Sequence, residues 1–254
     1  MNSCTVVDLG FAGYAEAYAL QQRVVALRKA QKIGDILLRC QHPHTITLGR
    51  SGKIGHLLAS ENVLRQKGVE FHHTDRGGDI TYHGPGQLVG YPIVNLAAIR
   101  RDVGWYVRML EEAMIRASAD FGIVAHREAG KTGIWVPGSS AGRPEKLAAI
   151  GVHLSRWVTS HGFAYNVATD LRYFDLIVPC GIAERKATSL EKLLGRAVSI
   201  AEVAERVTRH LGEVLEREMR EVSAREFLDH LNEAEASIAV PAECATIAAG
   251  RSEA

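Results

Sequence analysis

The chain has 254 residues, enough to bury one large hydrophobic core or two small ones. Hydrophobic residues make up 46% of it and charged residues 23%, as in an ordinary globular protein. A formal net charge of +1 gives no general attraction to nucleic acid or to a membrane surface. The N-terminus shows no export signal, and no apolar run approaches the roughly 20 residues that cross a bilayer. We therefore expect a cytoplasmic protein that binds neither nucleic acid nor membranes.

Short strands and one helix are expected in the first hundred residues. The apolar and β-branched runs predict strands at residues 6–10, 36–40, 45–48, 69–73 and 88–94. The mixed amphipathic pattern of residues 15–32 predicts a helix. The last two strands flank a glycine-rich segment, so we expect that segment to be a loop.

Two amphipathic helices are predicted in the remainder of the chain. The first runs over residues 103–121, where Val107, Leu110 and Met114 recur at steps of three and four and Asp102 is a good N-cap. The second begins at Ser199, which together with Glu202 matches a capping box. A short helix is expected after residue 223, as far as Leu231. Strands are predicted at residues 123–126, 133–136, 147–152, 157–160, 163–167 and 174–178.

Many short strands with a few long helices packed on them predict an α+β, or mixed α/β, domain. We expect this domain to span residues 1–222. A C-terminal extension, residues 223–254, should follow it. Its last fourteen residues have little to pack against and are expected to be loose.

The segment RGGDITYHGPGQ, residues 76–87, is the most informative in the chain. Five of its twelve residues are Gly or Pro, which lets the backbone turn sharply and approach a ligand closely. Arg76, Asp79, Thr81, Tyr82 and His83 place charged and hydrogen-bonding groups on the same segment. Loops that only connect strands seldom need both properties, so the segment predicts the floor of a binding site.

Cys180 and Lys146 are the candidates for covalent chemistry. Cys180 stands between Pro179 and Gly181, and such a turn can expose a nucleophile. With an unperturbed pKa near 8.5, only about 3% of a thiol is ionised at pH 7, so the sulfur needs a base nearby. Lys146 opens an apolar run, where desolvation would favour its neutral form. The residues alone also allow a buried structural cysteine and a strand-edge lysine. The other three cysteines, Cys4, Cys40 and Cys244, form no C-x-x-C pair and are interpreted as structural free thiols.

The histidines predict no metal site. No H-E-x-x-H or Cys/His ligand spacing occurs, and polar turn residues explain the pairs His42/His44 and His72/His73. His83 alone lies within the glycine-rich segment, so we take it as the site histidine. That segment matches neither of the two usual phosphate-binding glycine patterns, which argues against a nucleotide triphosphate or a dinucleotide there.

Five segments of the chain carry a resemblance to a known family. They are HPHTITLGR (42–50), RGGDITYHGPGQLVGYPI (76–93), GKTGIWV (130–136), KLAAIGVHLSRWVTSHGFAYNV (146–167) and YFDLIVPCGI (173–182). Together they resemble the octanoyltransferases, also called lipoyl(octanoyl) transferases. The resemblance covers about residues 35 to 182. It implies the fold of biotin and lipoate protein ligases, a mixed β-sheet with packed helices.

The resemblance also implies roles for particular residues. Cys180 would carry the acyl group, and Lys146 would activate it. The acyl and thioester site would be lined by Arg76, Gly77, Gly78, Asp79, Ile80, Thr81, Tyr82 and His83, by Ala149, Ile150 and Gly151, and by Gly162, Phe163 and Ala164. Backbone N–H groups around Gly78 or Gly151 are candidates for an oxyanion hole.

The family moves an octanoyl group from octanoyl-acyl carrier protein to a specific lysine of apo-lipoyl domains. These domains belong to the 2-oxoacid dehydrogenases and to the glycine cleavage system, and the transfer is the first step of lipoate assembly. Exchange of one thioester for another is nearly thermoneutral, and formation of the amide is downhill. The resemblance therefore implies no ATP, cofactor or metal, and we expect a monomer.

Three other functions are in competition. An ATP-dependent lipoate or biotin ligase on the same fold would activate a carboxylate and need no cysteine. A silent module that only binds lipoylated proteins would lack the cysteine or the lysine, and both are present. A cysteine hydrolase would need a cysteine–histidine pair, whereas the strongest partner here is a lysine.

Overall fold

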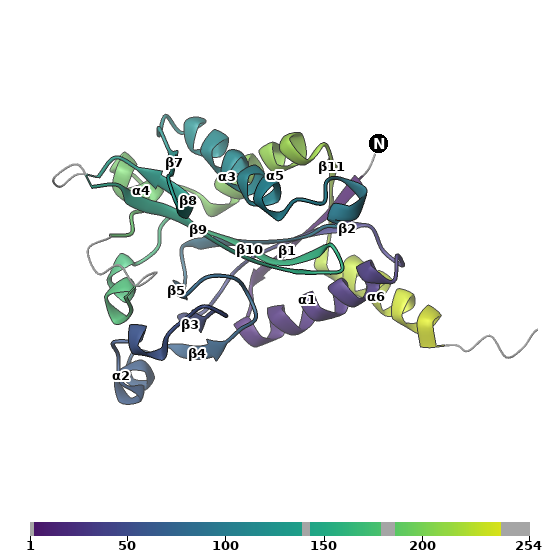
Figure 1. The fold of residues 1–254 in the computed structure, drawn as a ribbon, viewed down its shortest axis with the longest axis horizontal. Helices are drawn as coiled ribbons and strands as arrows, with labels where there is room; N and C mark the ends of the chain where they lie inside the picture. Colours follow the sequence, from purple (N-terminus) through teal and green to yellow (C-terminus); the bar gives the residue numbers. More distant parts are fainter. Residues whose placement is uncertain (1–2, 139–142, 179–185, 240–254) are drawn as a thin grey trace, which may run out of the picture.

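The computed structural model describes residues 3–138, 143–178 and 186–239. Within these ranges the chain forms a central eight-stranded sheet and a separate three-stranded sheet, with helices on both faces of the central sheet (Figure 1). The expected mixed α/β class is therefore confirmed.

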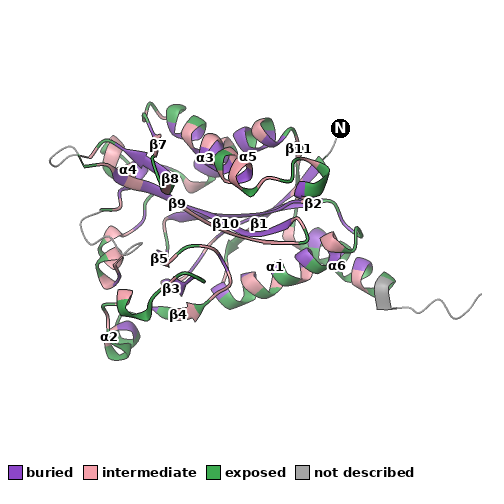
Figure 2. Ribbon diagram, in the orientation of Figure 1, coloured by how far each residue is buried: buried purple, intermediate pink, exposed green. Residues whose placement is uncertain are grey.

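The central sheet has the strand order β11-β1-β2-β6-β10-β9-β8-β7. Its first three strands are parallel to one another, and every later pair is antiparallel. The strands are β1 (Ser3–Phe11), β2 (Asp35–Gln41), β6 (Gln87–Ile93), β7 (His126–Glu128), β8 (Lys131–Val136), β9 (Glu145–Ser155), β10 (Val158–Asn166) and β11 (Glu218–Val222). Helices cover the middle of this sheet on both faces, which explains why β2, β6 and β10 are almost entirely buried (Figure 2).

The small sheet has the order β4-β3-β5 and packs with short helical segments. Its strands are β3 (Thr45–Leu48), β4 (Glu70–His73) and β5 (Ile80–His83), and the segments around it are η1 (Ile54–His56), α2 (Glu61–Gln66) and η3 (Leu171–Leu176). Ile46, Tyr82 and Ile177 belong to a separate hydrophobic cluster here. Because β5 pairs with β3, residues 80–83 of the glycine-rich segment form a strand; residues 76–79 and 84–86 are loop, and Gln87 begins β6.

Four long helices lie on the two faces of the central sheet (Figure 1). On one face are α1 (Tyr14–Lys29) and α6 (Ala224–Ala239), and on the other are α3 (Val103–Ala119) and α5 (Ile200–Leu215). Two short elements, η2 (Leu96–Ala98) and α4 (Leu190–Leu194), complete the set. The prediction for α3 is confirmed, including its cap, since the Asp102 carboxylate accepts the Trp105 N–H over 2.9 Å. Helix α6 is longer than expected, and Phe227 and Leu231 reach the core under α1.

The strand predicted at residues 174–178 is wrong. Residues 171–176 instead form η3, whose first turn is capped by the Asp170 carboxylate. Tyr173, Phe174 and Leu176 pack against the cluster beneath the small sheet. A short apolar run is buried equally well as a strand or as a helical turn, so its composition could not decide between them.

Three further predictions need correction. Residues 123–125 form no strand, and β7 begins only at His126. Ser199 does precede α5, but its side chain makes no capping bond, and the Glu202 side chain binds Arg206. The strands predicted at 157–160 and 163–167 are one continuous strand, β10. It follows β9 through a tight turn in which Arg156 and Trp157 both have positive φ angles, 49° and 65°, which two-residue hairpins require and which the sequence does not signal.

Leu110 gives a direct test of the packing between α3 and the central sheet. It is fully buried, in a cluster with Leu37 and Leu211. Leu110→Ala should lower the free energy of unfolding by about 2–5 kcal/mol, because it leaves a cavity that the rigid neighbours cannot close. Urea denaturation would measure this loss. The control Val103→Ala, at a site 45% exposed on the same helix, should change stability by about 0.5 kcal/mol or less.

None of the helices in the described ranges combines the length and the apolar character that a membrane crossing requires.

Candidate active site

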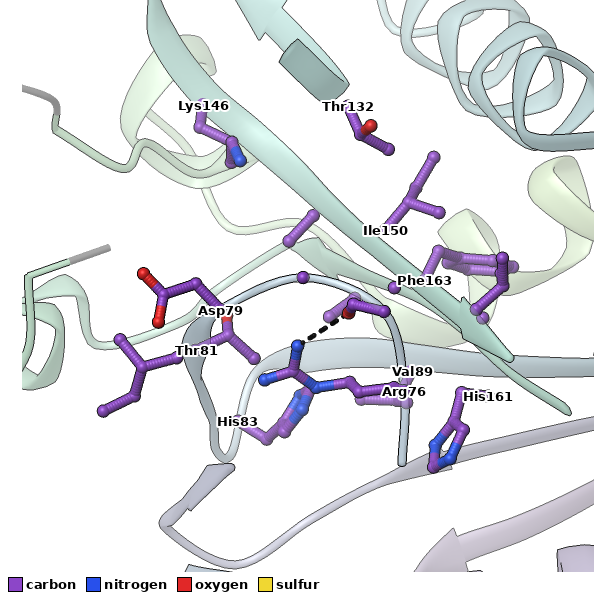
Figure 3. A pocket seen from close by; sticks show the side chains of 18 of the residues that line it. Arg76, Asp79, Thr81, His83, Val89, Thr132, Lys146, Ile150, His161 and Phe163 are labelled. Carbon is purple, nitrogen blue, oxygen red and sulfur yellow. Dashed lines mark hydrogen bonds between the residues drawn. The ribbon is translucent and has the colours of Figure 1, made fainter. Parts of the chain in front are cut away.

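A cavity of about 590 Å³ lies between the central sheet and the small sheet. Strands β5, β6, β8, β9 and β10 contribute to its lining, as does the residue Tyr14 of α1. The segment 76–79, which joins β4 to β5, arches over it (Figure 3). Residues far apart in the sequence therefore meet in one space.

Backbone hydrogen bonds hold the segment 76–79 on both sides. The N–H of Gly77 donates to the carbonyl of Val152 on β9 over 2.9 Å. On the other side, Arg50 N–H donates to the carbonyl of Arg76 over 3.0 Å, and Ser51 N–H to that of Gly78 over 3.2 Å. Gly78 has φ +88°, a conformation that favours glycine. The loop is thus tied to both sheets.

Arg76 anchors this loop from inside. Its guanidinium donates to the Thr47 carbonyl over 2.7 Å, to the Thr47 hydroxyl over 2.9 Å and to the Gly77 carbonyl over 3.1 Å. The side chain is buried yet lines the cavity. It therefore places a permanent positive charge in the cavity wall.

Gly151 is required by the close approach of the loop to β9. A Cβ atom at this position would lie 2.7 Å from the carbonyl oxygen of Gly77 and 3.2 Å from Cδ of Arg76. Gly151 also pairs with Gly162 on β10, where a Cβ atom would collide with the Gly90 carbonyl of β6. The contact with the loop explains the glycine at position 151.

The cavity extends into a split between β8 and β9. Pairing of these strands runs only from Val136/Glu145 to Ile134/Ala148. At Gly133, where φ is +114°, the N–H donates to the Glu111 carboxylate of α3 over 3.0 Å. Beyond this point Lys131 and Thr132 on one side, and Ala149 to Gly151 on the other, line the cavity, and Val107 of α3 lines it too. The split gives the cavity an apolar branch toward α3.

Lys146 stands near the start of β9, opposite Trp135 of β8. Its Nζ lies 4.7 Å from the centroid of the indole ring, and the side chain lines the cavity. The Lys146 N–H donates to the Lys186 carbonyl over 3.0 Å, and its carbonyl accepts the Thr188 N–H over 2.9 Å. Residues 186–188 therefore run beside Lys146 as a parallel bridge.

Cys180 lies outside the described residues, which stop at Val178 and resume at Lys186. The chain is held on both sides of this gap. The Val178 N–H donates to the carbonyl of His56 over 2.7 Å, and Lys186 and Ala187 line the cavity. The distance between Cys180 and Lys146 remains untested.

Cys4 and Cys40 are buried free thiols, as expected. Burial raises the pKa of Cys4 to about 12, and it raises the pKa of Cys40 further still. Neither sulfur lines the cavity. Both are therefore poor nucleophiles at neutral pH, whereas Cys244 lies outside the described residues.

The predicted site residues that the structure describes converge on the cavity with one exception. Those that line it are Arg76, Gly77, Gly78, Asp79, Ile80, Thr81, His83, Lys146, Ala149, Ile150, Gly151, Gly162, Phe163 and Ala164. Tyr82 instead lies in the cluster under the small sheet, where its hydroxyl is 2.7 Å from Nδ1 of His44. The alternation of β5 explains the difference, since Thr81 and His83 face the cavity and Tyr82 lies between them. The roles of these residues remain predictions.

His161 lines the cavity and was not predicted. Its Nε2 lies 2.7 Å from the Asp75 carboxylate, which also accepts the Tyr18 hydroxyl over 3.0 Å. Burial lowers the pKa of His161, and the bond to Asp75 acts in the opposite direction. His161 has φ +55°, a strained conformation for a residue within a strand. The break expected between residues 160 and 163 was the one signal of this irregularity.

Within the described ranges, no group of three His, Cys, Asp or Glu side chains is placed to hold a metal ion.

The sequence profile of the lipoyl protein ligase A/B catalytic domain matches residues 13–212. An octanoyltransferase of Solibacter usitatus is 52% identical over 219 residues, 86% of this chain and 96% of its own length. One from Chloroflexus aurantiacus is 50% identical over 221 residues, 87% of this chain and 97% of its own. The chain belongs to the octanoyltransferase family. It is an acyltransferase that moves octanoyl groups in lipoate biosynthesis.

Solved structures agree on the fold of this octanoyltransferase. A bipartite lipoate protein ligase from Thermoplasma acidophilum superimposes with a TM-score of 0.72, at 18% identity and with 92% of each chain covered. A lipoate-protein ligase A bound with ATP gives a TM-score of 0.70, at 17% identity, covering 91% of this chain and 93% of the other. The expected ligase-type fold is confirmed. At these identities the likeness concerns the fold alone.

Proposed function

We propose that this octanoyltransferase takes its acyl group from octanoyl-acyl carrier protein onto Cys180 and passes it to a lysine of an apo-lipoyl domain. Lys146 moves the protons in both steps. The acceptors are lipoyl domains of 2-oxoacid dehydrogenases and of the glycine cleavage system. We further propose that the reaction takes place in the cytoplasm and that the enzyme is a monomer.

The observation that carries this proposal is the position of Lys146. Its side chain lines the cavity, and the chain that resumes at Lys186 is hydrogen-bonded to both the N–H and the carbonyl of the Lys146 backbone. Cys180 is six residues before Lys186, and six residues span at most about 20 Å. Because Lys186 lines the cavity, this reach allows the Cys180 sulfur and the Lys146 side chain to meet there.

In the first half-reaction, the Cys180 sulfur attacks the thioester carbonyl of the donor. A new C–S bond forms, the bond to the carrier's thiol breaks, and Lys146 passes the proton from Cys180 to the departing thiol. One thioester replaces another, so the step is close to thermoneutral. Backbone N–H groups near Gly78 or Gly151 are candidates for stabilising the oxyanion.

In the second half-reaction, the lysine amine attacks the enzyme thioester. The C–N bond forms, the C–S bond breaks, and one proton from the nitrogen passes through Lys146 to restore the Cys180 thiol. An ammonium with a pKa near 10.4 has no lone pair for attack, so it must first lose one proton to the solvent. Formation of the amide is downhill and needs no ATP. The apolar branch beside Val107, Ile150 and Phe163 would hold the eight-carbon chain.

Two incubations of the pure protein test the proposal against an ATP-dependent ligase. With octanoyl-acyl carrier protein alone, intact-protein mass spectrometry should find one octanoyl adduct on the enzyme. That adduct should disappear when an apo-lipoyl domain is added. Incorporation from free octanoate with ATP, and none from the carrier thioester, would replace this proposal with the ligase mechanism. Light scattering on the same sample would test the monomer.

Gly151→Ala should slow transfer without unfolding the protein. The new methyl group would push against the Gly77 carbonyl and the Arg76 side chain, so the loop must move off β9. Displacements of this size cost about 10- to 100-fold in kcat/KM. The control Gly34→Ala meets no heavy atom within 4 Å and should keep full activity. Equal activities of the two variants would show that the loop contact is unimportant for catalysis.

A further inference from the structure

A chain of buried hydrogen bonds leads from the cavity to the backbone of Lys146. His83 Nδ1 lies 2.9 Å from Gln87 Oε1, and Gln87 Nε2 lies 2.9 Å from Asn166 Oδ1. Asn166 Nδ2 donates to the Thr188 carbonyl over 3.0 Å, and the Thr188 N–H donates to the Lys146 carbonyl. All four residues from His83 to Thr188 are buried, with exposures of 7% or less. The chain spans β5, β6 and β10 and ends beside β9.

The Thr188 carbonyl at one end of this chain fixes which group donates and which accepts in each of its hydrogen bonds. A carbonyl can only accept, so the amide nitrogen of Asn166 must face Thr188 and its oxygen must face Gln87. Gln87 therefore donates with Nε2, which also donates to the Tyr82 carbonyl over 3.2 Å. Its oxygen then faces His83, and the His83 nitrogen at that contact must carry the hydrogen. The network thus selects the Nδ1–H tautomer of His83.

The other ring nitrogen of His83 is left as an acceptor. Burial, followed by the nearby His42 and Arg76, lowers the pKa of His83 to about 3, so the ring is neutral at pH 7. No hydrogen bond from the described residues reaches its Nε2, and the residue lines the cavity near Arg76 (Figure 3). A neutral imidazole with Nδ1–H has a lone pair on Nε2.

We propose that His83 Nε2 accepts a hydrogen bond from the incoming lysine amine, and that Gln87 and Asn166 are positioning residues that hold the ring in the required tautomer. The inference rests on the proposed two-step transfer and names a residue for its second step. Neither the octanoyl chain nor a thioester carbonyl has an N–H or O–H group that can donate a hydrogen bond, whereas the amine nucleophile has an N–H.

His83 orients the amine and does not deprotonate it. Burial lowers the pKa of His83 far below that of an amine, so a proton transferred from the nucleophile would not stay on His83. The permanent charge on Arg76 also disfavours a second cation in the cavity, which helps the amine to arrive neutral. The proton released in the step goes to the Cys180 sulfur through Lys146, as above.

Two substitutions of His83 distinguish the role of Nδ1 from that of Nε2. The side-chain amide of asparagine can replace Nδ1 and its bond to Gln87, but it does not reach the place of Nε2. The amide of glutamine reaches the place of Nε2 and keeps an acceptor there. Octanoyl-enzyme would be prepared from each variant, and its loss on mixing with apo-lipoyl domain would be followed by mass spectrometry. His126→Asn, at a half-exposed position outside the cavity lining, is the control.

We expect H83N to slow loss of the octanoyl group by about 10- to 100-fold, the effect of one buried hydrogen bond. Formation of the acyl-enzyme should stay within about threefold of the parent, and H83Q should recover most of the aminolysis rate. If H83N instead slows acylation and leaves aminolysis normal, the inference is wrong. His83 Nε2 would then accept a hydrogen bond from an amide N–H of the octanoyl donor. Failure of the parent protein itself to form an acyl-enzyme would instead refute the proposed function.

The tautomer has a test that needs no activity. In ¹⁵N-labelled protein, the His83 nitrogens should show a protonated Nδ1 and a bare Nε2, unchanged between pH 5 and 8. Gln87→Leu removes the oxygen that accepts the hydrogen of Nδ1, so both tautomers should then appear. A protonated Nε2 in the parent protein would rule out the acceptor role, whatever the kinetics of the variants.

Discussion

Cys180→Ala should abolish octanoyl transfer and leave no acyl adduct on the protein. The thioester that links the two half-reactions forms on this sulfur in the proposed mechanism, and an alanine methyl group cannot replace it. Intact-protein mass spectrometry after incubation with octanoyl-acyl carrier protein measures the adduct directly. Transfer to the apo-lipoyl domain should fall to the uncatalysed rate.

Cys4→Ala is the matched control for this experiment. Cys4 is 2% exposed in the core, and its raised pKa keeps it a thiol, so the variant should still form the adduct. An adduct of full stoichiometry on Cys180→Ala would refute the assignment of the nucleophile. Urea denaturation of both variants would separate loss of chemistry from loss of the folded state.

Lys146→Ala should lower kcat/KM by about 10²- to 10⁴-fold, the usual contribution of a general acid–base. Without an amine beside it, Cys180 keeps the low thiolate fraction of an ordinary thiol, and the leaving groups receive no proton. Labelling of Cys180 by iodoacetamide at pH 7 should slow in the same variant. Lys146→Arg should restore much of the labelling rate but not the transfer, because a guanidinium stabilises a thiolate and does not give up its proton.

Lys32→Ala, on an exposed loop far from β9 in the sequence, provides the control. It should match the parent protein in both labelling and transfer. Equal labelling rates for the parent and Lys146→Ala would remove the activating role of Lys146. Transfer by Lys146→Arg at the parent rate would show that its charge, and not proton transfer, is what the reaction needs.

Elements with strong local signals were predicted well. Helix α3 starts at its predicted cap, Asp102, and β3 has the predicted bounds, residues 45–48. Both signals are local, because they depend on side chains within one turn or one strand. The strand predicted at residues 174–178 was wrong because the apolar residues there fit the cluster under the small sheet in either conformation.

The sequence by itself determined the family, the glycine-rich segment and the two residues proposed for chemistry, since these depend on residue types at short spacings. The tertiary structure alone decided how distant parts combine: the loop crosses β9 at Gly151, Asp75 meets His161, and a carbonyl at Thr188 sets the tautomer of His83. Such contacts follow from strand order and register. Those are set by the packing of the whole chain, and no local spacing encodes them.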